Sequence, residues 1–308
     1  MTVHGSWTLD ALVAAYGQHL HRTRGLRDGT FAQHELHVRR FVRAALGDGP
    51  IDVGRLGPAD VVAFILRSKD RFRPRTVGTV ATALRSFFRF LRAEGLSDGR
   101  LEAAVPSVAS WRLATLPRGL TDEQLARLLE SASTSTGPNA ARDRAILVCL
   151  ASLGLRAGEV ADLRLDDIDW RAGTIHIRAH KTRRAGVLPL PRDVGRAIVA
   201  YLRVERPKTT ERCVFLLHGS DGRSSPFGRG RVSGIVARAL RRAGIRAPIF
   251  GAHVLRHTLA SRMVRRGTSL KEVADFLGHR SLDTTAIYAK LDLPALRDVA
   301  LPWPEVTP

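Results

Sequence analysis

The first hundred residues repeat apolar side chains at the spacing of an α-helix. The earliest stripe follows Thr8, which can cap a helix, and consists of Leu9, Leu12, Val13, Tyr16 and Leu20. Comparable stripes predict three more helices, one from about Thr30, one from Pro58, and one from about Thr76 that Gly95 ends. Residues 1–100 are therefore predicted to form an all-α domain.

Pro106 and Pro117 interrupt the helical period, and we place an inter-domain linker at residues 101–118. A capping box from Thr121 to Gln124 then opens a second domain, residues 119–290. Its predicted helices cover residues 141–153, 158–163, 193–203, 232–240 and 270–277. Ser281 can cap one further short helix, which carries Tyr288.

Between these helices the period of the apolar residues changes from 3.6 to 2. Residues 174–178 and 186–190 alternate on either side of a polar tip, Lys181 to Arg184, which predicts a β-hairpin. A short apolar run at 213–217 precedes a Gly- and Ser-rich stretch, 218–230, that we expect to be a loop. The predicted fold class is mainly α with a small antiparallel β-sheet, so the second domain is of the α+β kind.

Charge, more than hydropathy, distinguishes this chain of 308 residues. Its 44% hydrophobic and 25% charged residues are typical of a folded protein with room for two domains. However, 49 Lys and Arg stand against 29 Asp and Glu, a net charge of +20 with a pI near 11.4. Both halves are basic, because residues 1–108 hold 16 basic and 10 acidic side chains and the remainder 33 and 19. This balance indicates double-stranded DNA gripped from two sides, with an acidic membrane surface as the competing explanation.

The sequence carries no signal for secretion or membrane insertion. Its two cysteines, Cys149 and Cys213, lie in separate apolar runs, which argues against a disulfide framework and against a metal site. The first residues, MTVHGSWTLD, lack the apolar core of a signal peptide. No apolar run approaches the roughly 18–20 residues of a membrane span. We therefore expect a cytoplasmic protein without membrane contacts.

One predicted helix of the first domain carries a row of arginines opposite its apolar stripe. Arg85, Arg89 and Arg92 are spaced i, i+4 and i+7 with no acid between them, and Arg73 and Arg75 precede them. The simplest interpretation is a solvated basic face. Because the row contains no acid, we favour contact with DNA phosphates.

Six residues of the second domain suit chemistry at a phosphodiester: Arg156, Lys181, His253, Arg256, His279 and Tyr288. Such a reaction needs a nucleophile, cations for the phosphate oxygens and a proton for the leaving oxygen. Arginine binds phosphate as a fork and stays charged. A tyrosine with a pKa near 10 costs about 4 kcal/mol to ionise at pH 7, so it can act only among positive donors.

Taken singly, these residues also have structural explanations. Arg156 falls in a turn after Gly154, where an arginine can be a cap or a surface charge. Tyr288 can belong to the core. Arg183 and Arg184 could replace Lys181 at the hairpin tip, or contact DNA themselves.

The order of these motifs resembles the tyrosine recombinases, also called the phage integrase family. The resemblance covers residues 119–290 and rests on GLRAGE at 154–159, Lys181, HVLRH at 253–257, LGH at 277–279 and Tyr288. The helical front resembles the SAM-like core-binding domain of that family by size and helix content. In the family, the residues at the positions of His257 and Glu159 are structural, and Glu159 would hold the loop of Arg156.

The resemblance implies a role for each candidate. Arg156 and Arg256 would clamp the scissile phosphate, and His253 and His279 would bond its oxygens. Lys181 would protonate the departing 5′ oxygen, while Tyr288 would form a 3′-phosphotyrosyl bond. Because that bond stores the energy of the broken strand, resealing needs no cofactor, neither ATP nor metal.

The resemblance also implies a setting for the reaction. We expect a homo-oligomer, a tetramer on two DNA sites, or assembly with related recombinase subunits, and the tail at residues 291–308 would dock on a neighbouring subunit. The expected role is integration or excision of a mobile element in DNA of the cytoplasmic nucleoid. Two alternatives stay open: a DNA-binding relative without catalysis, and an enzyme similar to type IB topoisomerases.

Overall fold

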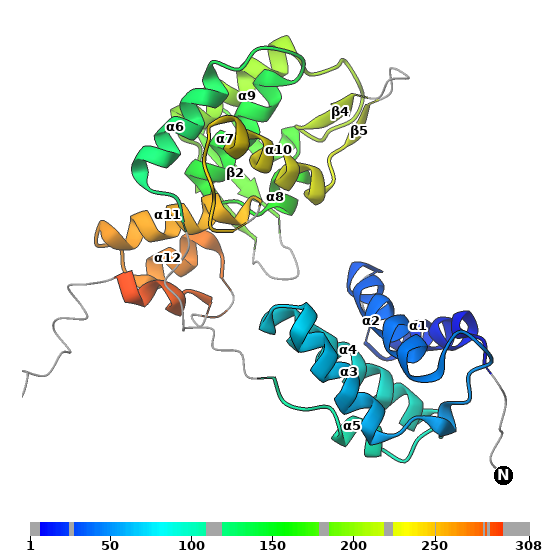
Figure 1. Cartoon of the computed structure of the whole chain (residues 1–308). Helices are drawn as coiled ribbons and strands as arrows, with labels where there is room; N and C mark the ends of the chain where they lie inside the picture. The colour runs from blue at the N-terminus through cyan, green and yellow to red at the C-terminus, as the bar shows by residue number, and fades with distance from the viewer. Residues whose placement is uncertain are drawn as a thin grey trace, which may run out of the picture. The chain divides into compact units, whose positions relative to one another are not determined.

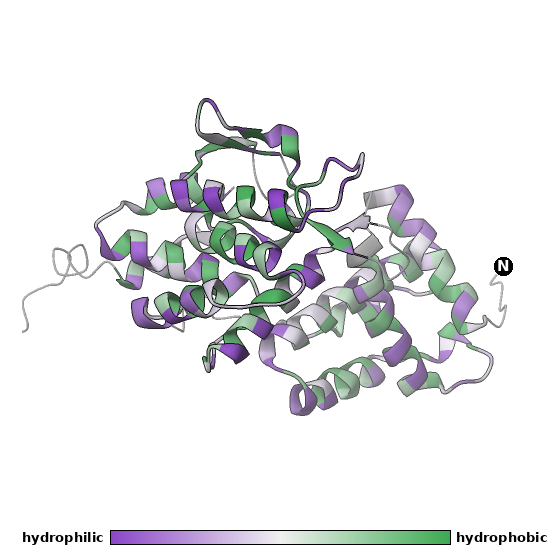
Figure 2. Ribbon diagram, turned by 90° about the horizontal axis from the view of Figure 1, so that it is seen from above, coloured by the Kyte–Doolittle hydropathy of each residue, from purple (hydrophilic) through white to green (hydrophobic). Residues whose placement is uncertain are grey.

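The computed structural model describes residues 7–24, 28–108, 119–178, 185–218, 224–249, 251–279, 281 and 284–291. Contacts divide the chain into two compact units, Met1–Trp111 and Arg112–Pro308, each of which is described by itself (Figure 1). Hydrophobic and hydrophilic residues alternate along the helices (Figure 2). Within the described ranges no helix is long and apolar enough to cross a membrane.

The first unit is built from helices, and an isolated antiparallel β-bridge joins Trp7 and Ile51. Its elements are α1 (Leu9–Arg24), α2 (Asp28–Leu46), the 3₁₀ turn η1 (Val53–Arg55), α3 (Pro58–Arg71), α4 (Pro74–Ala93) and α5 (Arg100–Ala103). The four longer helices confirm the predicted ones. Helix α4 supplies most of the aromatic core, in which Tyr16 packs edge-on against Phe87 and at a tilt against Phe90, with ring separations of 5.4 and 5.6 Å. Gly95, with φ of 70°, follows the end of α4 as predicted.

The predicted start of the linker at residue 101 has to be corrected. Residues 100–103 form α5, which packs on α3 and α4, and both Leu101 and Val105 are buried in the core of the first unit. A helix of four residues makes little more than one turn, so its sequence shows no period that could be recognised. The structure therefore assigns residues 100–108 to the helical unit.

The second unit combines helices with two small sheets. Its helices are α6 (Asp122–Ser133), α7 (Ala140–Leu153), α8 (Ala157–Ala161), α9 (Arg192–Val204), α10 (Arg229–Arg242), α11 (His253–Arg265) and α12 (Leu270–Leu277), with 3₁₀ turns η2 (Leu165–Asp167) and η4 (Ala286–Leu291). Its strands are β1 (Ile168–Asp169), β2 (Thr174–Ile177), β3 (Gly186–Pro189), β4 (Leu216–His218) and β5 (Ser224–Pro226). The capping boxes at Thr121 and Ser269 form as predicted.

The predicted hairpin is confirmed and gains a third strand. Strands β1, β2 and β3 are antiparallel, with Ile175 opposite both Ile168 and Leu188. These three side chains are buried on one face, whereas His176 and Val187 are exposed on the other. Strand β1 escaped prediction because two residues show no alternation.

Two further expectations change. Residues 224–226, predicted as loop, pair with β4 as strand β5, because backbone hydrogen bonds can form there without any apolar alternation. Helix α10 begins at Arg229, within the stretch expected to be loop. Tyr288 lies on a 3₁₀ helix, η4, which is a tighter element than an α-helix.

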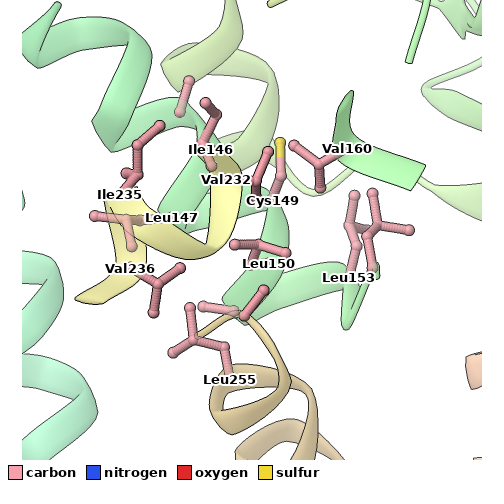
Figure 3. Packing of buried hydrophobic residues seen from close by; sticks show 14 of the residues in the cluster. Ile146, Leu147, Cys149, Leu150, Leu153, Val160, Val232, Ile235, Val236 and Leu255 are labelled. Atoms are coloured by element: carbon pink, nitrogen blue, oxygen red, sulfur yellow. The ribbon is translucent and has the colours of Figure 1, made fainter. Parts of the chain in front are cut away.

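Helix α7 is the centre of the second core. It is apolar on several sides, and Figure 3 shows its side chains packed against those of α8, α10 and α11; the labelled residues are Ile146, Leu147, Cys149, Leu150, Leu153, Val160, Val232, Ile235, Val236 and Leu255. Complete burial of this kind stabilises each large aliphatic side chain by about 1.5–3 kcal/mol. The helix is consequently held from several directions.

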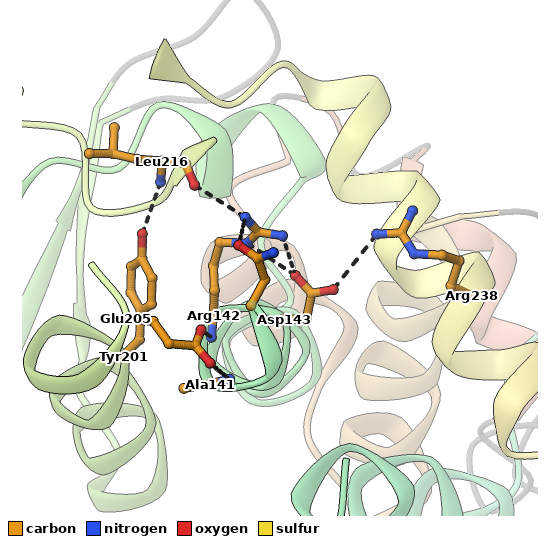
Figure 4. A network of polar contacts seen from close by, with 8 residues as sticks. Ala141, Arg142, Asp143, Tyr201, Glu205, Leu216 and Arg238 are labelled. Atoms are coloured by element: carbon orange, nitrogen blue, oxygen red, sulfur yellow. Dashed lines mark hydrogen bonds and ion pairs between the residues drawn. The ribbon is translucent and has the colours of Figure 1, made fainter. Parts of the chain in front are cut away.

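A polar network fixes the N-terminal end of α7 (Figure 4). The Glu205 carboxylate accepts hydrogen bonds from the backbone N–H groups of Ala141 and Arg142 at 2.8 and 2.9 Å, which satisfies donors that a helix leaves unpaired. The Arg142 guanidinium donates to the Leu216 carbonyl, and the Leu216 N–H donates to the Tyr201 hydroxyl at 3.1 Å. With one end fixed, α7 places its other end, at Gly154, in a defined position.

Candidate active site

Helix α11 carries two of the six predicted residues, His253 and Arg256, and lies beside elements that carry or precede the others described. It packs on α7, α12 and η4. His253 is its first residue and is exposed, while Arg256, one turn later, is 4% exposed. The spacing of three therefore places the two residues one turn apart, but in different surroundings.

Arg256 joins the two turns that carry Arg156 and His279. Its Nη1 donates to the Gly154 carbonyl at 2.6 Å, and its Nη2 donates to the Leu277 carbonyl at 2.8 Å. Gly154 lies two residues before Arg156, and Leu277 lies two residues before His279. A buried guanidinium, with its planar array of donors, is suited to hold both carbonyls at once.

The Arg156 turn is held by Glu159, as predicted. The buried Glu159 carboxylate accepts from the Arg156 backbone N–H at 2.9 Å and from Arg156 Nη1 at 2.8 Å. Gly154 makes the turn possible, since its φ is 60° and a Cβ there would lie 2.8 Å from Leu277 and 2.9 Å from Leu259. Glu159 thus fixes both the backbone and the side chain of Arg156 at the start of α8.

His279 and Tyr288 are linked through Thr285. The His279 turn begins at Gly278 in the left-handed conformation, and the His279 N–H donates to Ala274 O at 2.8 Å. His279 Nδ1 lies 2.6 Å from the hydroxyl of Thr285, which is fully buried. The Tyr288 N–H donates to the Thr285 carbonyl at 2.9 Å.

Tyr288 is buried in this structure. It is 2% exposed and belongs to a small core with Ala260, Val264, Val273 and Leu277. Its hydroxyl lies 2.6 Å from Nδ1 of His257. Burial raises the pKa of Tyr288 to about 12, although the charge of Arg256 acts in the opposite direction. Ionising such a phenol at pH 7 costs about 7 kcal/mol, more than for an exposed tyrosine.

His257 is neutral in this arrangement. Burial, together with the neighbouring His253 and Arg256, lowers its pKa to about 4. Its ring lies 6.4 Å from the ring of His253 and 5.7 Å from that of Tyr288. His257 therefore lies between the exposed histidine and the tyrosine.

Five of the six predicted residues thus come together around α11. Arg256 bonds the turns before Arg156 and His279, His279 and Tyr288 both bond Thr285, and His253 begins the helix that carries Arg256. The sixth, Lys181, lies between β2 and β3 outside the described residues, as do Arg183 and Arg184.

The row of arginines on α4, for which we favoured contact with DNA phosphates, has partners within the first unit that the sequence did not predict. Arg85 donates to the carbonyls of Val105 and Pro106 at 3.1 and 2.9 Å. Arg89 Nε donates to Glu102 at 2.8 Å, and Arg92 lies 3.6 Å from the same carboxylate. The acidic partner that the row itself lacks is therefore Glu102 of α5. At the other end of α4, Arg73 and Arg75 are exposed.

Sequence reasoning missed two partners of the site. His257 had an available signal, because it follows His253 by four residues and so shares its helix face. Thr285 had none, since a threonine between helices is ordinary in sequence. Its role becomes visible only through its contact with His279.

Residues 118–293 match the family described as the Phage integrase family, and residues 13–95 match its N-terminal SAM-like domain. The chain belongs to the phage integrase family. The resemblance predicted from the sequence is confirmed. The family assignment also agrees with the mainly helical fold and its small antiparallel sheets.

Among relatives in this family, a Sinorhizobium fredii protein named as an integrase/recombinase, y4rA, is 45% identical over 98% of this chain and 73% of its own length. Tyrosine recombinase XerD of Mycobacterium tuberculosis is 33% identical over 95% of this chain and 96% of its own. A lambda integrase dimer bound to a core site shares the fold, with a TM-score of 0.68 and 19% identity over 99% of this chain and 82% of that one.

Proposed function

We propose that this member of the phage integrase family is a site-specific DNA recombinase that cuts a strand through Tyr288 and keeps it as a 3′-phosphotyrosyl intermediate. The observation that carries the proposal is the pair of hydrogen bonds from buried Arg256 to Gly154 O and Leu277 O. These bonds hold together the turns that carry Arg156 and His279, two predicted phosphate ligands, near the predicted nucleophile Tyr288.

In the proposed reaction the Tyr288 oxygen attacks the scissile phosphorus as its phenolic proton is lost. The bond from phosphorus to the 5′ oxygen breaks, and Lys181 supplies the proton that this oxygen needs. Arg156 and Arg256 neutralise the two phosphate oxygens that do not bridge, with His253 and His279 as hydrogen-bond partners. One phosphodiester is exchanged for another, so the reverse reaction can reseal the strand.

The proposed attack requires Tyr288 to leave its buried position. A side chain that is 2% exposed cannot reach a DNA phosphate, and its raised pKa opposes formation of the phenolate. Both obstacles fall when the hydroxyl moves toward Arg156 and Arg256, because positive charge lowers the pKa of a phenol. The movement needed is confined to η4, a single 3₁₀ element at the edge of the core.

DNA binding is proposed to involve both units. The net charge of +20 and the exposed Arg73 and Arg75 favour a polyanion on the first unit. On the second unit, Arg183 and Arg184 of the hairpin tip remain the proposed contacts. The setting remains a proposal too: integration or excision of a mobile element in nucleoid DNA, in line with the integrase/recombinase name of the Sinorhizobium relative.

A trapping experiment tests the proposed function. Nicked duplexes with a randomised core are incubated with the protein, so that a short 5′-hydroxyl strand diffuses away after cleavage and the adduct accumulates. Adducts are recovered on a denaturing gel and sequenced, which also gives the DNA site. We expect adducts with the wild-type chain and none with Tyr288→Phe.

Other outcomes identify the alternatives. Binding of the selected DNA without any adduct would indicate a DNA-binding relative that has lost catalysis. Relaxation of a supercoiled plasmid without exchange between two sites would indicate a topoisomerase. Either result contradicts the proposed recombinase.

Assembly is tested on the DNA site recovered in this way. We propose a tetramer that holds two sites, with residues 291–308 contributing to contacts between subunits. Truncation after Lys290 should then reduce the mass of the DNA complex in sedimentation. A truncated chain that assembles as the full chain does would refute the role of the tail.

A further inference from the structure

We propose that His257 is a positioning residue that holds the Tyr288 hydroxyl in its buried place until DNA is bound. This inference rests on the proposed function, in which Tyr288 is the nucleophile. His257 thereby acquires a specific task, which differs from the purely structural role that its position in the HVLRH motif suggested.

The geometry carries the proposal. His257 Nδ1 and the Tyr288 hydroxyl are 2.6 Å apart, and they come from α11 and η4, 31 positions apart in sequence. The hydrogen bond from the Tyr288 N–H to Thr285 O also contributes to holding η4, and Tyr288 packs in a small core with four other buried residues. A short hydrogen bond in so small a core is a large part of what retains the side chain.

A second tyrosine–histidine pair in the same chain shows what a permanently buried contact looks like. The Tyr16 hydroxyl lies 3.0 Å from Nδ1 of His34, and Tyr16 is enclosed by Phe31, Phe87 and Phe90. That tyrosine projects from the middle of a helix of 16 residues. Tyr288 instead lies on a six-residue 3₁₀ element and packs in a core of five buried residues, much smaller than the core around Tyr16.

Acceptance of the phenolic proton by His257 is the competing role, and the electrostatics oppose it in this arrangement. The pKa of Tyr288 is raised to about 12 and that of His257 is lowered to about 4. Both shifts disfavour transfer of the proton from phenol to imidazole in this arrangement. The contact holds a neutral phenol beside a neutral imidazole, as expected for a restraint.

The test measures access to Tyr288 in the free protein. The chain has three tyrosines, and Tyr16, Tyr201 and Tyr288 are all buried. Tetranitromethane, which nitrates accessible phenolates, should therefore modify each of them slowly, as followed by peptide mass spectrometry. His257→Leu removes the hydrogen bond, and nitration of Tyr288 should accelerate at least tenfold while Tyr201, in the same unit, stays protected.

Conservative and matched variants separate the hydrogen bond from packing. His257→Asn places an amide near the position of Nδ1 and should restore protection to within about threefold of wild type. His34→Leu makes the same change beside Tyr16, which should stay unreactive because the helical core encloses it. If His257→Leu unfolds the unit, as exposure of Tyr201 would reveal, His257→Gln takes its place, since its longer side chain carries the amide away from Nδ1.

Two results would overturn the proposal. The first is a Tyr288 that stays as protected in His257→Leu and His257→Gln as in wild type. The second is an equal loss, of about a hundredfold or more, in the rate of adduct formation by His257→Leu and His257→Asn. Neither replacement side chain can accept a proton, so this result would assign proton transfer to His257. Because nitration needs no DNA, failure of the proposed recombinase would be distinguishable from failure of this inference.

Discussion

Replacement of Arg256 by methionine should destabilise the catalytic unit even without DNA. Methionine fills a similar volume but has no donor, so the Gly154 and Leu277 carbonyls lose the contacts at 2.6 and 2.8 Å. Each buried acceptor left without its donor costs about 1–3 kcal/mol. Because the variant also avoids burial of a charge, we expect a net loss of about 2–4 kcal/mol.

A matched substitution on the same helix provides the control. Arg262 of α11 lies 2.9 Å from Asp122, but its side chain is 29% exposed and that of Asp122 is 63% exposed. Ion pairs near the surface contribute about 0–1 kcal/mol. Arg262→Met should therefore change the stability of the unit by less than about 1 kcal/mol.

Hydrogen exchange followed by mass spectrometry measures both variants without assuming that the two units unfold together. Peptides from α7 and α11 should exchange about 30- to 900-fold faster in Arg256→Met, which is the expected loss of free energy expressed as a rate ratio. Peptides from the first unit should be unchanged. An Arg256→Met variant no less protected than Arg262→Met would refute the assignment of Arg256 as the residue that joins the two turns.

Three further predictions concern other residues of the site. Gly154→Ala should lower the free energy of unfolding by about 2–4 kcal/mol, since it adds left-handed strain and close contacts, whereas Gly158→Ala, with open space around it, should be neutral in the same urea titration; equal effects would refute the argument. Because the pKa of His257 is depressed in the folded state, the free energy of unfolding should fall as the pH drops from about 6.5 toward 4, by about 3 kcal/mol relative to His257→Asn. Parallel pH profiles of stability for the two proteins would contradict this. Lys181→Ala should slow cleavage at least about a hundredfold on normal DNA. The loss should be much smaller when sulfur replaces the 5′ oxygen, because a thiolate leaves without a proton. A loss of the same size on both substrates would show that Lys181 is not the general acid.

Local interactions explain what could be predicted from the sequence. The capping boxes at Thr121 and Ser269 each span three residues, so spacing alone reveals them, whereas the contact of Glu159 with Arg156 was expected from the resemblance to the family. The β2–β3 hairpin and the apolar stripes likewise repeat within a few positions. Features of this kind follow from the geometry of one helix or one strand pair.

Contacts between distant segments could not be predicted in the same way. Arg256 and Gly154 are 102 positions apart, and Tyr288 and His257 are 31 apart. The ion pair of Arg89 was not predicted because Glu102, 13 positions later, lies on a helix too short to recognise, and phosphate contact by Arg89 stays a prediction. In each case the decisive partner is fixed by packing of whole elements.

The burial of Tyr288 changes how its chemistry is understood. From the sequence, the tyrosine could be either a nucleophile or a core residue. In the structure it occupies a core position while its backbone is bonded to Thr285, the partner of His279. Under the proposed function, a tyrosine kept protonated in a small core would be stored without reacting, which suits the proposed cleavage of DNA.

The most direct test of the account identifies the residue and the bond in the trapped adduct. After digestion with protease and nuclease, mass spectrometry should find the peptide that contains Tyr288 with a nucleotide attached through its 3′ phosphate. An adduct on another residue, or one attached through a 5′ phosphate, would contradict the central claim.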